Sequence, residues 1–270
     1  MRILNVISLY PPFTIGGAER GTHNIAQSWV EMGHEVHTLA LRSPVCNTSD
    51  KVDGVHVERI AMANLYWPFG SEREANPVKR LLWHTIDTHN TTMVQRVIEK
   101  VRRIAPDVIL TRNLQGFSTA IVPALKSLGI PVVQVLHDLS LICVRTALYR
   151  GNQACESHQK RCLDCRLLTA PRHRHLQAVD GVIGVSRYIL DMHLEHGLFV
   201  GKPNFVVHNA LRRDITPRAG IPSRNPARPI RFGFIGRVHP AKGIETILTA
   251  LTDLKAQGQR FEFHVGGEGE

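Results

Sequence analysis

Short apolar runs alternate with longer amphipathic segments along most of the chain. The runs predict strands, because a bounded stretch of about four to eight apolar residues is typical of a buried strand, and the segments predict helices, because their apolar residues recur at helical spacing. Repeated strand–helix units indicate an α/β fold built on a doubly wound parallel sheet. The predicted strands are Met1–Ser8, Glu35–Ala40, Gly54–Ile60, Asp107–Thr111, Pro131–Leu136, Gly181–Val185, Phe205–His208, Ile230–Ile235 and Arg260–Val265. The predicted helices are Ala18–Met32, Pro77–Ile104, Ala120–Leu128, Arg187–His196 and Ile244–Gln257.

One segment interrupts this alternation. Residues Arg212–Pro229 contain four prolines and five arginines with little apolar periodicity, a composition typical of a linker. We therefore predict a first domain over residues 1–211, a linker over 212–229 and the start of a second Rossmann-like domain over 230–270. A single strand–helix–strand unit cannot cover both faces of a parallel sheet, so the second domain is expected to be incomplete.

Composition and charge limit the classes of function. Hydrophobic residues at 43% and charged residues at 21% of the 270 residues are ordinary for a globular protein. The formal net charge of +10 favours anionic partners, but no helix-turn-helix or aromatic–basic sheet signature accompanies it, so nucleic acid is not an expected partner. No run of eighteen apolar residues occurs, and Met1–Tyr10 does not read as a signal peptide, so we expect a cytoplasmic protein.

Two glycine-bearing loops each lie between a strand and a helix. Gly16 and Gly17 precede the first predicted helix, where free backbone N–H groups and the helix dipole can attract an anion; a simple tight turn is the alternative interpretation. The second loop, Gly236–Gly243, carries Arg237 and Lys242 five residues apart around a proline. Two cations at the start of a helix can hold adjacent phosphates, so this loop predicts a diphosphate site.

These motifs together resemble the family 4 glycosyltransferases, retaining enzymes of the GT-B fold with two Rossmann-like domains. The resemblance rests on Leu9–Pro12 followed by Gly16–Glu19, on Val185-Ser186, on Val207–Ala210 and on the G-R-x-x-x-x-K-G element at Gly236–Gly243. Ala210 stands where the family usually has glycine. The resemblance covers essentially the whole chain.

The resemblance implies a role for individual residues. Arg237, Lys242, Gly16 and Gly17 would bind the diphosphate of a nucleotide sugar, supported by Gly236, Gly243, Asn209 and Ser186. His137 would face the transferred sugar, with a structural histidine at the strand end as the alternative, and Asp138 would orient that histidine or its loop. No cofactor is required for catalysis in such enzymes.

The resemblance also defines the expected function. It implies transfer of a sugar, with retention, from a UDP- or GDP-sugar to a glycan or lipid-linked acceptor in surface polysaccharide or glycolipid synthesis. The family's acidic E-x7-E pattern, which holds the donor sugar, is absent from these residues. The alternative is therefore a truncated, non-catalytic acceptor-binding protein.

A cysteine-rich insertion is predicted over residues 143–165. Cys143, Cys155, Cys162 and Cys165 could hold a structural zinc ion, or an iron–sulfur centre, in a tetrahedral thiolate site. Their spacing is not that of a zinc ribbon or a ferredoxin, and a loop with free thiols is the alternative.

Basic residues accompany apolar ones over Lys79–Arg103 and Arg166–His175. Such segments can rest on an anionic membrane surface, giving a peripheral protein at the inner face of the cell membrane. Solvated helical faces are the alternative.

Overall fold

The structure is a computed structural model that describes residues 1–14, 16–43, 49–69, 76–144, 146, 148–150, 153–155, 163–211 and 228–269. The chain divides into two compact units. The first comprises Met1–Leu148 and Glu156–Arg212, and the second comprises Tyr149–Cys155 and Arg213–Glu270. The predicted linker, Arg212–Pro229, lies outside the described residues except for its last two.

The first unit is built on an eight-stranded sheet with the order β10-β9-β6-β5-β1-β2-β4-β3. All neighbouring strands are parallel except β3, which runs antiparallel to β4 at the edge. The carboxyl ends of the parallel strands therefore meet at one edge of the sheet. The strands are β1 (Arg2–Val6), β2 (Glu35–Leu41), β3 (Ser49–Val52), β4 (Val55–Ile60), β5 (Val108–Thr111), β6 (Val132–Leu136), β9 (Gly181–Gly184) and β10 (Asn204–Val206).

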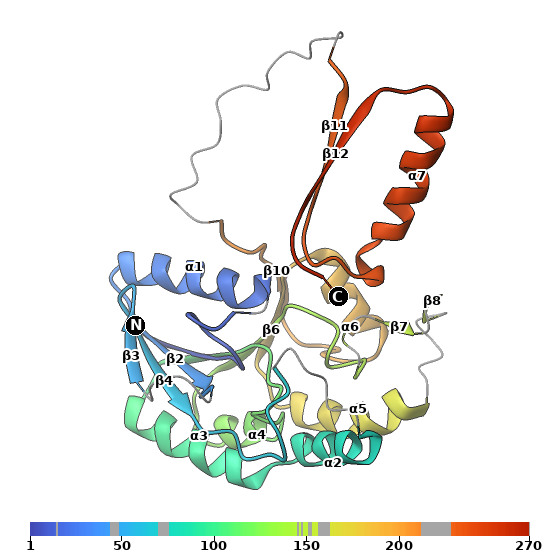
Figure 1. Ribbon diagram of the computed structural model, residues 1–270. Helices are drawn as coiled ribbons and strands as arrows, with labels where there is room; N and C mark the ends of the chain where they lie inside the picture. The colour runs from blue at the N-terminus through green and yellow to red at the C-terminus, as the bar shows by residue number, and fades with distance from the viewer. Residues whose placement is uncertain are drawn as a thin grey trace. The chain divides into compact units, whose positions relative to one another are not determined.

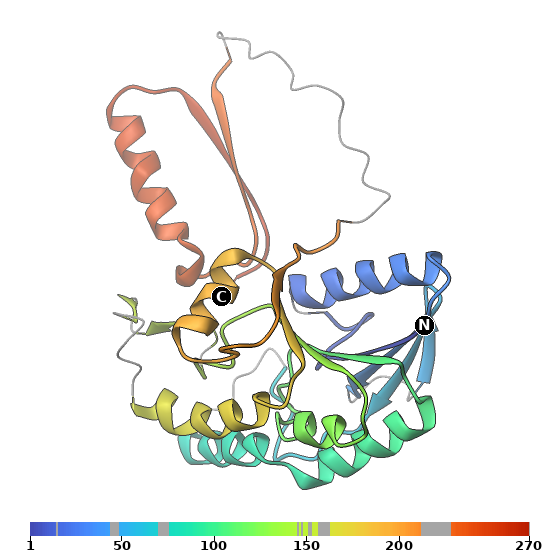
Figure 2. The ribbon, with the colours of Figure 1, turned by 180° about the vertical axis from the view of Figure 1, so that it is seen from behind.

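Helices cover both faces of this sheet. Helix α1 lies on one face, and helices α2 to α5 form a layer on the other, as both ribbon views show (Figure 1 and Figure 2). This two-sided cover explains why the central strands are almost wholly apolar. The helices of the unit are α1 (Gly17–Glu31), α2 (Pro77–Thr88), α3 (Thr91–Ile104), α4 (Ile121–Lys126), α5 (Leu163–Leu176) and α6 (Arg187–Glu195).

The main core of the first unit lies between the sheet and the layer that contains α3. Met93, Val97 and Val101 recur every four residues on α3, and each is fully buried. They belong to the same apolar cluster as Leu4 of β1 and Ile109 of β5. The helical spacing in the sequence thus identified the residues that attach α3 to the sheet.

The prediction of one helix over Pro77–Ile104 is wrong. Helix α2 ends at Thr88 and α3 begins at Thr91. The Asn90 side chain accepts a hydrogen bond from the N–H of Met93, at 3.0 Å, and so caps α3. An asparagine that satisfies a free N–H group starts a new helix more readily than it continues an old one.

Two elements of the first unit are absent from the prediction. Strand β3 is short and polar, so it lacks the apolar run by which strands were recognised. Helix α5 contains Pro171 and has weak apolar periodicity. The structure therefore adds an antiparallel edge strand and a helix to the predicted α/β pattern.

Among its described residues, the second unit contains two small strand pairs and one long helix. Strands β11 (Ile230–Ile235) and β12 (Phe261–Gly266) pair in parallel, joined through the 3-10 turn η1 (Pro240–Lys242) and helix α7 (Ile244–Ala256). This confirms the predicted strand–loop–helix–strand order. Strands β7 (Tyr149–Arg150) and β8 (Gln153–Ala154) form an antiparallel pair.

Candidate functional site

The loops that follow β1 and β5 are tied together at the carboxyl edge of the first unit's sheet. The Ser8 hydroxyl lies 2.6 Å from the carbonyl oxygen of Asn113 and 2.7 Å from that of Gln115. The N–H of Ser8 also donates to the Asn113 carbonyl, at 2.9 Å. Open parallel sheets bind their ligands at this edge, and the ties hold its loops in place.

A buried arginine joins three strands beneath this edge. Arg112 directly follows β5; its Nε donates to Asn5 Oδ1 of β1 at 3.1 Å, and its Nη1 donates to His137 Nε2 after β6, also at 3.1 Å. Burial lowers the pKa of Arg112 to about 10, which leaves the guanidinium charged at neutral pH. Burial, with the Arg112 charge as a second cause, lowers the pKa of His137 to about 3.

The two residues expected to face the sugar lie at the end of β6. His137 is half-buried, and its Nδ1 is buried without a hydrogen-bond partner among the described residues. Asp138 accepts a hydrogen bond from the N–H of Ser140 at 2.8 Å. Asp138 therefore stabilises the turn that begins the loop, and its role in orienting His137 stays a prediction.

Gly16 and Gly17 stand at the start of α1, as predicted. The N–H of Gly16 donates to the Glu19 carboxylate at 2.8 Å, so in this conformation it is not free to bind a phosphate. Gly17 is exposed in the first turn of the helix, where N–H groups have no intrahelical acceptor. Of the two predicted glycines, only Gly17 therefore keeps a backbone N–H that could bind a phosphate, together with the other N–H groups at the start of α1.

Asn209 and Ser186 serve the framework of the first unit. Asn209 packs against Gly21 of α1, where a Cβ atom would stand 2.9 Å from Asn209 Oδ1. Asn24, one turn further along α1, donates to the carbonyl oxygen of Ala210 at 3.0 Å. Ser186 caps α6 by accepting from the N–H of Ile189 at 3.2 Å. Both residues hold the segments that follow β9 and β10.

The predicted diphosphate loop lies in the second unit, between β11 and α7. Arg237 and Lys242 are both exposed. Gly243 precedes the helix with φ of 75°, a left-handed conformation that favours glycine. The loop therefore presents two exposed cations close in sequence to a helix N-terminus, a combination that suits phosphate groups.

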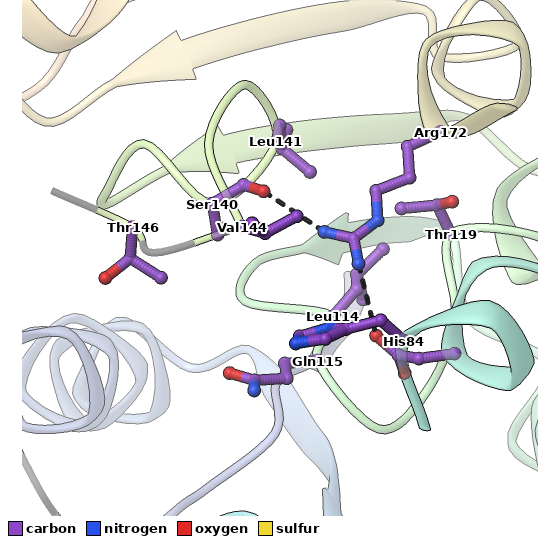
Figure 3. A pocket seen from close by; sticks show the side chains of 10 residues that line it. His84, Leu114, Gln115, Thr119, Ser140, Leu141, Val144, Thr146 and Arg172 are labelled. Carbon is purple, nitrogen blue, oxygen red and sulfur yellow. Dashed lines mark hydrogen bonds and ion pairs between the residues drawn. The ribbon is translucent and has the colours of Figure 1, made fainter. Parts of the chain in front are cut away.

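The first unit also has a pocket that the sequence did not predict (Figure 3). Arg172 of α5 donates from Nη1 to the Ser140 carbonyl at 3.2 Å and pairs with Asp87 of α2 at 3.8 Å. Asp87 also accepts from the N–H of Gly116 at 2.7 Å, and its burial raises its pKa to about 6. The pocket is lined by His84, Asp87, Leu114, Gln115, Thr119, Ser140, Leu141, Val144, Thr146 and Arg172.

The predicted metal site is only partly visible. Cys143 and Cys165 are buried, and their sulfur atoms lie 4.0 Å apart. Two thiolates of a tetrahedral zinc site stand about 3.8 Å apart, so this spacing fits a shared ion. Cys162 lies outside the described residues. The residues that are described contain no group of three or more potential metal ligands, and the four-cysteine site stays a prediction.

None of the helices described in the structure is long and apolar enough to cross a membrane.

The predictions made from the sequence did not include Arg112, Asn5 or the Asp87–Arg172 pair. The signals available in the sequence were Asn5 among the apolar residues that end β1 and an arginine directly after β5. Asp87 and Arg172 are separated by 85 positions in the sequence, and only the packing of α2 against α5 brings them together.

Several solved structures share this fold. The chain matches sucrose-phosphate synthase from Thermosynechococcus elongatus with a TM-score of 0.64 at 14% identity, over 99% of this chain and 62% of that one. It matches the catalytic domain of starch synthase IV from Arabidopsis thaliana, bound to ADP and acarbose, with a TM-score of 0.56 at 14% identity, over 99% and 68%. The lipopolysaccharide outer core galactosyltransferase WaaB gives a TM-score of 0.56 at 14% identity, over 100% and 62%. These likenesses confirm the predicted α/β fold of the GT-B type.

Sequence comparison identifies a relative and a family. The chain is 28% identical over 245 residues to a protein named "Uncharacterized 42.6 kDa protein in cps region" from Klebsiella pneumoniae, covering 91% of this chain and 63% of that protein's length. The family model of the glycosyl transferase 4-like domain matches residues 16–210. The chain therefore belongs to the glycosyl transferase 4-like domain family.

Proposed function

We propose that the protein is a retaining glycosyltransferase that moves a sugar from a UDP- or GDP-sugar to a glycan or lipid-linked acceptor in surface polysaccharide or glycolipid synthesis. The observation that carries this proposal is the loop between β11 and α7. Its exposed Arg237 and Lys242, beside the start of α7, suit a diphosphate leaving group whose negative charge grows as the sugar departs.

The comparisons support the kind of donor and acceptor. The name of the Klebsiella relative refers to a cps region, which agrees with polysaccharide synthesis. The starch synthase structure holds ADP, the nucleotide part of a sugar donor, together with acarbose. The galactosyltransferase WaaB acts on the lipopolysaccharide outer core, as its name states.

A panel of nucleotide sugars tests the proposal. We expect one UDP- or GDP-sugar to raise the thermal melting temperature of the whole chain and to be slowly hydrolysed. Arg237→Ala and Lys242→Ala should each weaken donor binding about tenfold or more, because each removes a charged hydrogen bond to phosphate. NMR of the transferred product should show the anomeric configuration of the donor.

Two control variants separate a specific phosphate contact from a general loss of positive charge. Arg231→Ala removes an exposed arginine from β11, and Lys255→Ala removes an exposed lysine from the last turn of α7. Both variants should bind the nucleotide sugar like the wild type. Equal losses in all four variants, or no response to any nucleotide sugar, would contradict the donor proposal. The second result would favour the non-catalytic acceptor-binding protein.

The proposal includes association with an anionic membrane surface. Trp83 and Asp87 form the buried side of α2, while Val78, Leu81 and Leu82 are 64%, 53% and 51% exposed. On α5, Leu167 is 66% exposed beside the exposed Arg166. Helix α2 adds the exposed Lys79 and Arg80. Exposed leucines flanked by cations are typical of a helix that rests in a lipid interface.

Helix α3 marks the limit of this surface. It lies in the same layer but exposes polar residues, among them Gln95, Glu99 and Arg102. The basic segment Lys79–Arg103 of the sequence is therefore divided, and only its α2 part suits a membrane.

Flotation with lipid vesicles tests the membrane surface. The whole chain should float with phosphatidylcholine vesicles that contain about a third phosphatidylglycerol and should be released by high salt. Leu81→Glu combined with Leu82→Glu should reduce binding at least about tenfold, because charge is excluded from the acyl region. Gln95→Glu on α3 is the matched control. Equal binding by both variants, or no binding by the wild type, would refute the surface.

A further inference from the structure

We infer that Arg112 is a positioning residue that holds His137 in the neutral Nδ1–H tautomer and so restricts it to donating a hydrogen bond. The inference rests on the proposed function only in taking His137 as a residue that faces the sugar.

Arginine can only donate hydrogen bonds, and this determines the tautomer of His137. A guanidinium carries five N–H donors and no acceptor. Arg112 Nη1 lies 3.1 Å from His137 Nε2, so this imidazole nitrogen accepts and cannot itself carry a hydrogen. The neutral ring must then carry its hydrogen on Nδ1.

The surroundings of the pair favour the neutral ring. Arg112 is 4% exposed, and its second bond, from Nε to Asn5 Oδ1, fixes the guanidinium in the plane that reaches His137. A second positive charge on His137 would face that guanidinium across a single hydrogen bond, in a region from which water is excluded. The other titratable groups near the pair are Tyr10 on the β1 side, Asp138 on the same loop and His193 of α6, which faces Asp138. The Asp138 carboxylate is already engaged by the N–H of Ser140.

The chemistry open to His137 depends on which of its two ring nitrogens is not bonded to Arg112. The only lone pair of neutral His137 is occupied by Arg112, so His137 cannot remove a proton from an acceptor hydroxyl. Its Nδ1–H is buried and has no acceptor among the described residues, which is a costly state for a polar group. This N–H can be satisfied by a hydroxyl or carbonyl oxygen of the bound sugar, which makes His137 a donor to substrate oxygen.

Histidine NMR tests the inference without any activity assay. In the whole chain labelled with 15N-histidine, long-range proton–nitrogen spectra distinguish the two tautomers and the cation. We expect His137, identified by the signal lost in His137→Gln, to show the Nδ1–H pattern without titrating from pH 5 to 8. In Arg112→Met the ring should change toward the Nε2–H tautomer, and its pKa should rise by about one unit or more. Arg112→Lys, which keeps a charged donor, should restore much of the wild-type pattern.

Arg59→Met is the matched control, because Arg59 is as buried as Arg112 but donates to the Pro11 carbonyl instead. Its His137 signal should stay unchanged. A wild-type His137 with the hydrogen on Nε2, or one that titrates near pH 6.5, would overturn the inference even if Arg112→Met fails to fold. An unchanged His137 in a folded Arg112→Met would overturn it as well. Neither result depends on whether the protein binds a nucleotide sugar.

Discussion

At the scale of single residues, the central strands β5 and β6 are apolar except at Thr111 and Gln134. There Thr111 donates to Gln134 Oε1 at 2.7 Å, and Gln134 donates in turn to the carbonyl oxygen of Arg112 at 3.0 Å. These two side chains are thus satisfied by a neighbouring strand, and their hydrogen bonds tie the end of β5 to β6. Such a network is costly to interrupt, because its members are shielded from water.

The pH dependence of stability should report the buried His84. Burial, assisted by the charge of Arg172, lowers its pKa from 6.5 to about 4. Between these values the unfolded chain binds a proton that the folded chain does not, so the contribution of neutral His84 is present above pH 6.5 and lost as the pH falls toward 4. As the pH falls from 6.5 to 4, the free energy of unfolding should decrease in both proteins, but less in His84→Gln. The difference between the two decreases should reach up to about 3 kcal/mol.

Urea unfolding at pH 4.5, 5.5 and 6.5 checks this dependence. Replacement of His264 by glutamine is the control, because this side chain is exposed in the folded chain. Asp87 acts in the opposite direction, because its raised pKa favours the folded state at low pH and this contribution is lost as the pH rises through about 6. A His84→Gln curve parallel to the wild type would show that His84 does not titrate as its burial requires.

The residue scale also shows what the sequence could and could not predict about the site. The family resemblance pointed to His137, which directly follows the clearly apolar strand predicted at Pro131–Leu136. Arg112 follows β5 in the same way, but an isolated arginine after a strand more often lies in solvent, and nothing local shows that Asn5 and His137 enclose it. Burial of a charge depends on neighbours that are distant in sequence, and periodicity carries no information about them.

At the scale of elements, α2 and α5 depend on each other through one buried ion pair. Asp87 of α2 pairs with Arg172 of α5 and also holds the loop at Gly116. The pair therefore connects two helices to the loop that follows β5.

Strands and helices with a clear apolar period, such as β11 and α3, were predictable from the sequence. Helix α5 was not, because Pro171 and the basic residues interrupt its apolar periodicity. Its buried side is formed by Cys165, Thr169 and Arg172.

Asp87→Ala should destabilise the first unit by about 3–5 kcal/mol, because removal of one partner leaves the other charge buried and unpaired. Thr85→Ala, on the exposed side of the same helix, should change the free energy of unfolding by less than about 0.5 kcal/mol. Urea unfolding followed by far-UV circular dichroism measures both. Equal stability of the two variants would mean that α2 is held by its apolar contacts alone.

At the scale of the whole molecule, the two units differ greatly in how much they bury. The first unit has an extensive aliphatic core, whereas Leu251 is the only buried hydrophobic residue among those described in the second unit. The prolines from Pro217 to Pro229 make a boundary near residue 212 readable in the sequence as a prediction. The position of β7 and β8 in the second unit was not, because a two-stranded hairpin within a cysteine-rich stretch has no apolar pattern.

Hydrogen exchange of the whole chain should reveal this difference. Amides of β11 and β12 should exchange at least about a hundredfold faster than those of β1, β5 and β6, because few buried contacts oppose local opening of the second unit. A saturating nucleotide sugar should slow exchange in β11, β12 and the intervening loop and leave β1 unchanged. Equal protection of the two sheets in the free chain would contradict the prediction.

The common direction of the parallel strands has a practical consequence for handling the protein. Met1 is 67% exposed at the amino edge of the sheet, where the Asp107 carboxylate accepts from the N–H of Arg2. Strand β1 is five residues long, so about 17 Å of strand separates this edge from the Ser8, Arg112 and His137 edge. A biotin or fluorescent dye attached at Met1 would therefore immobilise or report on the protein from the side opposite these loops, leaving them open to ligands in a biosensor.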